Sequence, residues 1–343
     1  MTDFLILKEK IQNMINERTV VITGVQGQTG SYAAEYYLRA GYHVTGIARR
    51  KSSGETNTNI DHILDDPNFS LVYGDITDSC FVSSTLEDLH PELYLNFAAM
   101  SHVGQSFKEP LETFQVDAAA VVMVLESIRR ISKHTKFYQA GTSEMWGASL
   151  CPMVGFSEES SFHPRSPYGV AKAAAFFAVK NYREAYGLYA CNGIVCNHSS
   201  VRRGHDFATR KITRGVASVK LGLASKLRMG NLDAFRDEGH AEDFVQAIAL
   251  MLKQPEPDDY VVSTGTGATI QQMFDFVCSL ANLKMDDIYV KDERFMRPSD
   301  VPRLLGNNSK IRRLGWNPRY DWRSLLTEMY QHDYEELSRI HKL

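Results

Sequence analysis

The chain has 343 residues, of which 43% are hydrophobic and 23% are charged, and its formal net charge is −3. This length allows one large domain with a smaller lobe, and the small net charge gives no global attraction to nucleic acid or to a membrane surface. The five cysteines show no C-x-x-C spacing and no neighbouring histidine cluster, which predicts reduced thiols and no metal site. We expect neither a signal sequence nor a membrane span, and therefore a cytoplasmic protein.

The first predicted elements are a helix and a dinucleotide-binding turn. Residues 1–17 have the apolar spacing of an amphipathic helix, and we expect this extension to make packing or oligomer contacts. A β-branched strand at 19–23 is followed by Gly24, Gly27, Gly30 and a helical pattern. The first glycine would form the tight turn, the second would admit a pyrophosphate, and the third would let the helix pack on the strand. The pattern favours a cofactor site over a plain glycine-rich loop.

The end of the second predicted strand bears on the choice of cofactor. This strand covers 43–48 and is followed by Arg49, Arg50, Lys51 and Ser52. The acidic residue that would bind an NAD ribose is missing there, and arginines at this place suit the 2′-phosphate of NADP. A solvated basic loop is the alternative.

Strands continue to alternate with helices over the first 200 residues. The third strand, at 69–73, ends just before Asp75, whose carboxylate we expect to accept a hydrogen bond from the adenine amine. Small residues at 98–102 follow the fourth strand, where a ligand can lie against the backbone. The alternation predicts an α/β fold with a Rossmann-type doubly wound parallel sheet. The other predicted elements are a helix from about 78, a strand at 93–97, a helix at 111–131, a strand at 136–140, a helix from 167 to about 186 and a strand at 189–196.

The stretch from Thr142 to Lys172 carries the predicted chemistry. The fifth strand delivers Thr142 and Glu144 to the carboxyl edge of the sheet, where the sites of α/β proteins lie. Tyr168 and Lys172 are four residues apart, so they share one face of the predicted helix. An ammonium near a phenol lowers the pKa of the phenol, which would make Tyr168 a general base. Glu144 is a second candidate base, and an exposed loop carboxylate is the alternative.

Past residue 200 the predicted elements become shorter and mixed. We divide the chain into the extension 1–17, a dinucleotide-binding domain at 18–200, and a mainly substrate-binding α/β lobe at 201–343 from which some segments return to the first domain. The region 202–214 is basic. The candidate binding cations of this lobe are Arg202, Arg210, Lys211, Arg236 and Arg303, each of which is alternatively a surface charge, and Asn197 and Asn231 are candidate hydrogen-bonding residues for a substrate.

Several of these motifs occur together in one known family. They include Y-G-D-I-T-D at 73–78, G-T-S-E-M-W-G at 141–147 and P-R-S-P-Y-G-V-A-K at 164–172. From about residue 18 to its end, the sequence resembles the GDP-mannose 4,6-dehydratases of the extended short-chain dehydrogenase/reductase family. The resemblance implies NADP as cofactor, GDP-mannose or a close GDP-sugar as substrate, and loss of water across C5–C6 after oxidation at C4. It also implies a homodimer or homotetramer in which the loop 49–52 reaches a neighbour's cofactor.

The resemblance further implies the roles of individual residues. The catalytic set would be Thr142, Glu144, Tyr168 and Lys172. Cofactor binding would involve Gly24, Gly27, Gln28, Gly30, Arg49, Arg50, Ser52, Asp75, Ile76, Phe97, Ala98, Ala99, Ser101, Phe114, Tyr168, Lys172, His198 and Arg203. Substrate binding would involve Ser101, Thr142, Ser143, Glu144, Asn197, Arg202, Arg210, Lys211, Asn231, Arg236 and Arg303.

The sequence departs from the family pattern at a few positions. Thr29 stands where an Asp is usual, Phe114 where a Tyr is frequent, and Pro302 where an Asp is found. Ser199 replaces a Glu, and Glu238 replaces a Trp. We expect the last two to border the sugar, which leaves a GDP-heptose open as the substrate.

Two other classes of function are open. A GDP-4-keto-sugar reductase or epimerase would need Tyr168 and Lys172 but has no use for Glu144. A non-catalytic NADP-binding regulator would predict loss of Tyr168 or Lys172, and both are present.

Overall fold

The computed structural model describes residues 18–50 and 59–342, so the predicted helix at 1–17 and Ser52 lie outside the described residues. Its centre is a parallel sheet with the strand order β10-β6-β5-β4-β1-β2-β3. The predicted doubly wound α/β fold is therefore confirmed, and the predicted strands are present. The strands are β1 (Thr19–Thr23), β2 (His43–Ala48), β3 (Phe69–Tyr73), β4 (Leu93–Asn96), β5 (Lys136–Ala140), β6 (Ala190–Val195) and β10 (Asp259–Val262).

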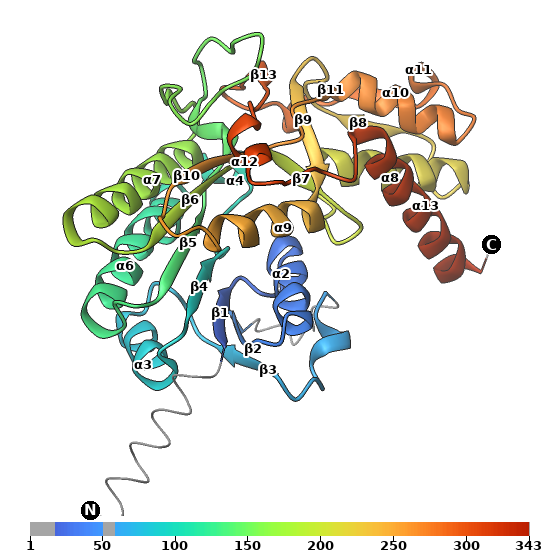
Figure 1. Ribbon diagram of the computed structural model, residues 1–343. Helices are drawn as coiled ribbons and strands as arrows, with labels where there is room; N and C mark the ends of the chain where they lie inside the picture. Colours follow the sequence, from blue (N-terminus) through green and yellow to red (C-terminus); the bar gives the residue numbers. More distant parts are fainter. Residues whose placement is uncertain (1–17, 51–58, 343) are drawn as a thin grey trace, which may run out of the picture.

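Helices cover both faces of this sheet (Figure 1). On one face, α3 (Ser79–Leu89), α6 (Ala120–Ile131) and α7 (Pro167–Tyr186) enclose one apolar core with the strands. On the other face, α2 (Gln28–Arg39) and α9 (Ala241–Leu252) enclose a second core. Polar side chains mark where these helices begin, because they accept hydrogen bonds from the free N–H groups of the first turn. Asp78 caps α3 in this way, and Ser166 caps α7.

The predicted helix 111–131 is interrupted. It consists of α5 (Pro110–Phe114), a π-helical turn at Gln115–Ala119 and α6. A π turn holds one extra residue and leaves the apolar periodicity on either side intact, so the sequence pattern reads as one helix. The turn matters because it carries Asp117 into the interior, where this side chain is fully buried.

The second lobe is a smaller α/β layer. The strand that leaves the central sheet continues as β7 (Asn197–Ser199), which pairs with β9 (Phe235–His240). Strands β11 (Gly267–Thr269) and β13 (Arg303–Leu304) flank β9, while β8 (Leu227–Met229) pairs with β12 (Tyr289–Lys291). The helices are α8 (Ala208–Lys220), α10 (Ile270–Leu280) and α13 (Trp322–His341), which share a third apolar core with this layer. Shorter helices are α4 (Val103–Ser106), α11 (Met285–Ile288), α12 (Ser309–Arg313) and the 3₁₀ turns Asp61–Ile63, Ser143–Met145 and Glu293–Phe295.

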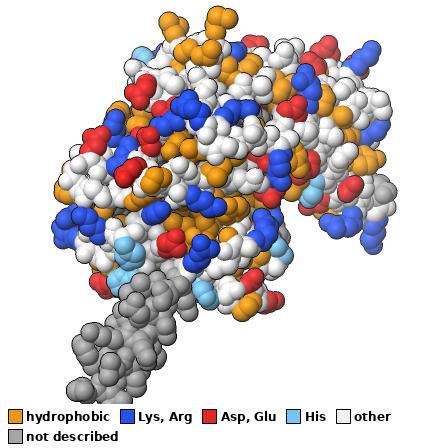
Figure 2. Space-filling model, viewed as in Figure 1, with side chains coloured by type: hydrophobic (Ala, Val, Ile, Leu, Met, Phe, Trp, Pro, Cys, Tyr) orange, Lys and Arg blue, Asp and Glu red, His pale blue; other side chains and the backbone are white. Residues whose placement is uncertain are grey.

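The two lobes are woven together. Both α9 and β10 come from the part of the chain past residue 200, yet they complete the central layer. Strand β10 lies beside β6 as the seventh strand of the sheet, and Ile311 of α12 packs into the same core as α9. No helix of the described residues is long and apolar enough to cross a membrane. Figure 2 shows acidic and basic side chains mixed over the visible face, in keeping with the small net charge.

Candidate active site

A cavity of about 640 Å³ opens at the carboxyl edge of the central sheet, a size typical of small-molecule sites. Its walls come from the turns after β1, β4, β5 and β6, so residues distant in sequence meet there. Most of the predicted site residues line it. They are Gly24, Gly27, Gln28, Gly30, Arg49, Asp75, Ile76, Phe97, Ala98, Ala99, Ser101, Thr142, Ser143, Glu144, Tyr168, Lys172, Asn197, His198, Arg202 and Arg203.

The glycine turn provides one end of the cavity. Gly24 has a φ of +65°, a conformation that other residues rarely adopt, and an added Cβ would lie 3.0 Å from the Ala98 nitrogen. At Gly30 an added Cβ would lie 2.3 Å from the Gly24 carbonyl oxygen, so only glycine lets α2 approach β1. Gly27 precedes the first turn of α2 and borders the cavity. The helix N-terminus therefore offers free N–H groups to an anion, as a dinucleotide pyrophosphate requires.

Tyr168 and Lys172 lie on one face of α7, with the Lys172 ammonium 5.8 Å from the centre of the Tyr168 ring. The ammonium donates to the Ala140 carbonyl over 3.1 Å. Burial raises the pKa of Tyr168, Asp117 adds to this rise, and the hydrogen bond with Thr142 opposes it. The expected lowering of the pKa of Tyr168 is thus not found, because desolvation outweighs the neighbouring charges.

Asp117 is a neighbour of this pair that the sequence pattern did not single out. One carboxylate oxygen accepts from the Met100 nitrogen over 2.9 Å, and the other is buried without a hydrogen bond. Burial lowers the pKa of Lys172, and the Asp117 charge is what opposes this shift. Conversely, burial raises the pKa of Asp117, and Lys172 opposes that rise. The two buried groups are therefore counter-charges, and Asp117 also ties the cofactor-side loop after β4 to the π turn.

Glu144 lies in the same cavity, two residues beyond Thr142. The Thr142 hydroxyl accepts from the Glu144 nitrogen over 3.2 Å and caps a 3₁₀ turn, which turns the glutamate inward. Glu144 is 8% exposed, so it is not a loop carboxylate in open solvent. Arg297, which the sequence reasoning missed, also lines the cavity, with Nη1 3.6 Å from Glu144 Oε1. Its only sequence signal is its place in the short R-P segment at 297–298.

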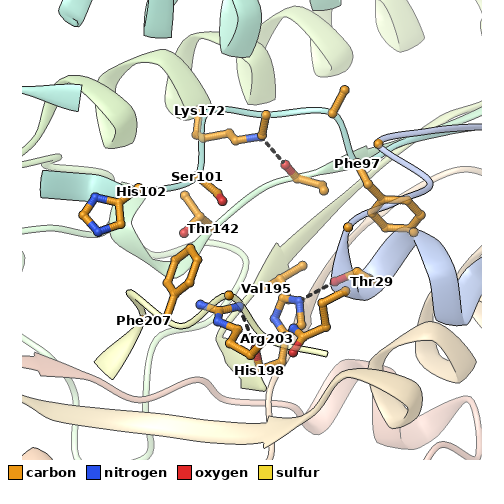
Figure 3. Close-up of a pocket in the computed structure, with 18 of the residues that line it drawn as sticks. Thr29, Phe97, Ser101, His102, Thr142, Lys172, Val195, His198, Arg203 and Phe207 are labelled. Atoms are coloured by element: carbon orange, nitrogen blue, oxygen red, sulfur yellow. Dashed lines mark hydrogen bonds between the residues drawn. The ribbon is translucent and has the colours of Figure 1, made fainter. Parts of the chain in front are cut away.

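A third cluster borders the opposite wall (Figure 3). The Thr29 hydroxyl and His198 Nε2 are 2.9 Å apart, and His198 Nδ1 is 3.0 Å from the Cys196 carbonyl oxygen. Burial and then the Arg203 charge lower the pKa of His198 to about 4, so this ring is neutral near neutral pH. The unusual Thr29 thus has a partner, a histidine that it helps to orient.

Several predicted binding residues do not line this cavity. Arg50 lies over the Tyr73 ring, and Phe114 borders a separate surface hollow. The cations of the second lobe are mostly engaged elsewhere: Arg210 pairs with Asp333 at 2.8 Å, Arg236 with Asp300 at 3.2 Å, while Lys211 lies over Phe295 and Arg303 over Phe235. Asn231 donates to Asp300, and Arg202, although it lines the cavity, pairs with Glu35 at 2.6 Å.

A Rossmann-type sheet with a threonine after β5 and a tyrosine–lysine pair on the next helix defines a short-chain dehydrogenase/reductase type of enzyme. The family model described as "GDP-mannose 4,6 dehydratase" matches residues 21–329, and the chain belongs to this family. A GDP-mannose 4,6-dehydratase of Vibrio cholerae is 42% identical, with 94% of this chain and 95% of the relative covered. One of Arabidopsis thaliana is 43% identical, with 94% and 88% covered.

Solved structures agree with the fold. A dTDP-glucose 4,6-dehydratase of Bacillus anthracis, in complex with NAD, superposes with a TM-score of 0.81 at 24% identity. The superposition covers 94% of this chain and 97% of that one. A UDP-glucose 4-epimerase of Thermotoga maritima also gives 0.81, at 22% identity, with 93% and 99% covered. These structures show the fold, while the family model and the two relatives confirm the resemblance inferred from the motifs.

Proposed function

We propose that the chain dehydrates GDP-mannose to GDP-4-keto-6-deoxymannose with NADP as a resident cofactor. The observation that carries this proposal is the presence of Glu144 in one cavity with Thr142, Tyr168 and Lys172. Tyrosine and lysine are what a sugar oxidation needs, and a second base is what an elimination adds. A 4-keto-sugar reductase or epimerase would leave the buried glutamate without a task.

Oxidation at C4 comes first because it makes the C5 proton acidic. Tyr168 takes the O4 proton, and Thr142, which is hydrogen-bonded to it, holds the same oxygen and stabilises its developing charge. The positive charge of Lys172 favours the phenolate once the site is filled. A nicotinamide dinucleotide held by the glycine turn and Lys172 would supply reversible hydride transfer, so the overall reaction would consume no cofactor.

The elimination of water is the task of Glu144. Its carboxylate removes the C5 proton and passes it to the C6 hydroxyl, which leaves as water. The double bond would then be saturated at C6 by a hydride, which is the chemistry that the cofactor would supply, and at C5 by a proton. The proton that Tyr168 took from O4 balances this last addition, so the cycle needs no external acid or base. Arg297 helps to keep Glu144 in its inward position between these steps.

The cofactor is a nicotinamide dinucleotide, and we propose NADP within this class. The glycine turn fits a dinucleotide because a Cβ at Gly24 or Gly30 would fill the space against Ala98 or the turn itself. The side that would face the adenosine ribose holds the exposed Arg49, and no acidic residue follows β2 at 49–52. A cation there matches a 2′-phosphate rather than a 2′-hydroxyl.

Replacing Arg49 by alanine is expected to weaken NADP binding about tenfold and to leave NAD binding within about twofold, because only NADP presents the phosphate. Titration calorimetry with each dinucleotide measures both effects. Arg130→Ala, which removes an exposed arginine paired with Glu126 on α6, is the matched control. An equal loss of affinity for the two dinucleotides would contradict the assignment of NADP.

The proposed sugar is mannose, with a GDP-heptose as the alternative. Ser199 and Glu238 were expected to border the sugar, but neither lines the cavity. The two substitutions that suggested a GDP-heptose therefore lie behind the cavity wall, and GDP-mannose is the favoured substrate. We also propose a homodimer or homotetramer, which the exposed apolar side chains Leu111 and Phe177 on α5 and α7 support.

One incubation tests the proposed function. The chain is mixed with GDP-mannose and catalytic NADP, and product mass and near-ultraviolet absorbance are followed together. We expect loss of one water per sugar with no net reduced cofactor. Net accumulation of reduced cofactor would indicate an oxidase or reductase. If the mass of GDP-mannose does not change but a GDP-heptose loses one water, the substrate is the heptose.

A further inference from the structure

The two unusual residues Ser199 and Glu238 contact each other. They lie on the neighbouring parallel strands β7 and β9, where Asn197 stands opposite Glu238. The Ser199 hydroxyl donates to a carboxylate oxygen of Glu238 over 2.5 Å and is 2.8 Å from the Thr209 hydroxyl of α8. Glu238 is 2% exposed and Ser199 is fully buried. The hydroxyl and the carboxylate thus form one closed pair behind the cavity wall.

The charge of this pair is incompletely balanced. A buried carboxylate is costly unless a cation compensates it, yet no described residue forms an ion pair with Glu238. Burial raises the pKa of Glu238 to about 7, with a contribution from Asp237, while Arg203, Ser199 and Arg236 oppose the rise. Arg203 is the strongest of the opposing groups. Glu238 therefore changes its charge near neutral pH.

Arg203 stands on the cavity side of the same wall. Its Nη1 donates to the His198 carbonyl over 2.8 Å, and its guanidinium lies 3.9 Å above the Phe207 ring (Figure 3). Its Nε is buried without a hydrogen-bond partner. Burial lowers the pKa of Arg203, and Glu238, ahead of Tyr168, is the charge that opposes this most. The guanidinium is thus a partly buried cation whose Nε donor is buried and unpaired, which suits a phosphate oxygen.

We propose that Glu238 of β9, held by Ser199, offsets the charge of Arg203 across the β7–β9 pair without a direct ion pair, and that a phosphate group of a bound ligand takes over this role. The proposal rests on the proposed function, in which the dinucleotide and the GDP-sugar both supply phosphates. Once a phosphate lies at Arg203, the nearby carboxylate is repelled and takes up a proton, which the Ser199 hydroxyl can accommodate because it is also within reach of the Thr209 hydroxyl. Ligand binding is then coupled to proton uptake at Glu238.

The sign of the pH dependence follows from this exchange. The anion favours protonated Glu238, so affinity is highest below pH 7 and falls as the pH rises through 7. Arg203 and Arg236 also face Glu238 and stay cationic over this range. The pKa of Asp237 is raised to about 6, so Asp237 gains negative charge between pH 6 and pH 7 and adds to the fall in affinity. With a pKa of about 7 for Glu238 before the ligand binds, affinity is expected to fall about tenfold from pH 6 to pH 8.

The test is titration calorimetry of the full chain with NADP alone and with GDP alone, at pH 6 and 8 and in buffers of different ionisation enthalpy. Phosphate monoesters themselves titrate near pH 6, so the informative quantity is the difference between proteins. Glu238→Gln mimics the protonated form. It is expected to lose the proton uptake, to change in affinity by less than about twofold over this range, and to bind more tightly than the unsubstituted chain at pH 8.

A double variant provides a second test, in which the carboxylate is moved to the neighbouring strand instead of being lost. Ser199→Glu combined with Glu238→Ser exchanges the two partners across the strands and keeps the composition. We expect it to regain the proton uptake, and the ligand that shows the effect, NADP or GDP, identifies whose phosphate lies at Arg203. Glu335→Gln, an exposed carboxylate on α13, is the control.

Two results would overturn the proposal. One is a Glu238→Gln protein with the proton count and pH slope of the unsubstituted chain. The other is a variant that is less stable to heat and binds poorly at every pH, which would assign Glu238 a structural role only. Failure of the proposed function is distinguishable, because a chain that binds NADP with proton uptake but does not dehydrate GDP-mannose would contradict the function and retain the exchange at Arg203.

Discussion

Glu144→Gln is expected to lower the rate of product formation by about 10² to 10⁴, because the amide cannot take the C5 proton. Oxidation at C4 does not require this carboxylate, so the variant should still oxidise the sugar once. We therefore expect one equivalent of reduced cofactor per active site to appear after mixing with GDP-mannose and to persist. Rapid-mixing absorbance and product mass measure the two parts of this prediction.

The control for this experiment is the same change at an exposed carboxylate. Glu335→Gln on α13 is expected to turn over at the rate of the unsubstituted chain and to accumulate no reduced cofactor. A Glu144→Gln protein that forms the keto-deoxy sugar at a near-normal rate would remove Glu144 from the mechanism. In that case the ion pair between Glu144 and Arg297 would be structural.

Tyr168→Phe is expected to have a similarly large effect at an earlier step. Without the hydroxyl nothing takes the O4 proton, so turnover should fall by about 10² to 10⁴ and no reduced cofactor should appear in the first cycle. Stopped-flow absorbance separates this variant from Glu144→Gln, since one blocks oxidation and the other blocks elimination. Because burial raises the pKa of Tyr168, the rate of the unsubstituted chain should also increase with pH.

Tyr94→Phe is the matched control for this tyrosine. Tyr94 is buried in the core beneath α3 and α6, and its hydroxyl has no hydrogen-bond partner among the described residues. We expect normal turnover, because this hydroxyl lies outside the cavity. Accumulation of reduced cofactor in Tyr168→Phe would show that another group takes the O4 proton, and Tyr168 would lose its assignment.

Local patterns were sufficient to predict most of the central layer. The strands at 19–23, 43–48, 69–73 and 136–140 are short, β-branched or aromatic runs bounded by turn residues, and their bounds were predicted as found. The glycine turn was predictable because a Cβ at each of its glycines would come too close to neighbouring backbone atoms. The π turn at Gln115–Ala119 was not, since one extra residue in a helix leaves no trace in composition or periodicity. Asp117 was missed for that reason.

The second lobe was less predictable because its charges are paired across long sequence distances. Arg210 was a reasonable candidate for a diphosphate, but its partner Asp333 lies 123 positions later on α13. No local pattern reports such a pairing. Arg297 was missed for the converse reason: it reaches Glu144 from an irregular segment whose path is fixed only by tertiary contacts.

The weaving of β10 and α9 into the central layer has a consequence for dissecting this chain. A fragment that ended near residue 200 would keep the glycine turn, Tyr168 and Lys172, but it would lack the strand that covers β6. The uncovered edge of β6 would then present free backbone groups to other molecules, as aggregating edge strands do. The half that holds the cofactor motif is therefore not expected to fold alone. Loss of the C-terminal part would expose the β6 edge to aggregation and would also remove the second lobe.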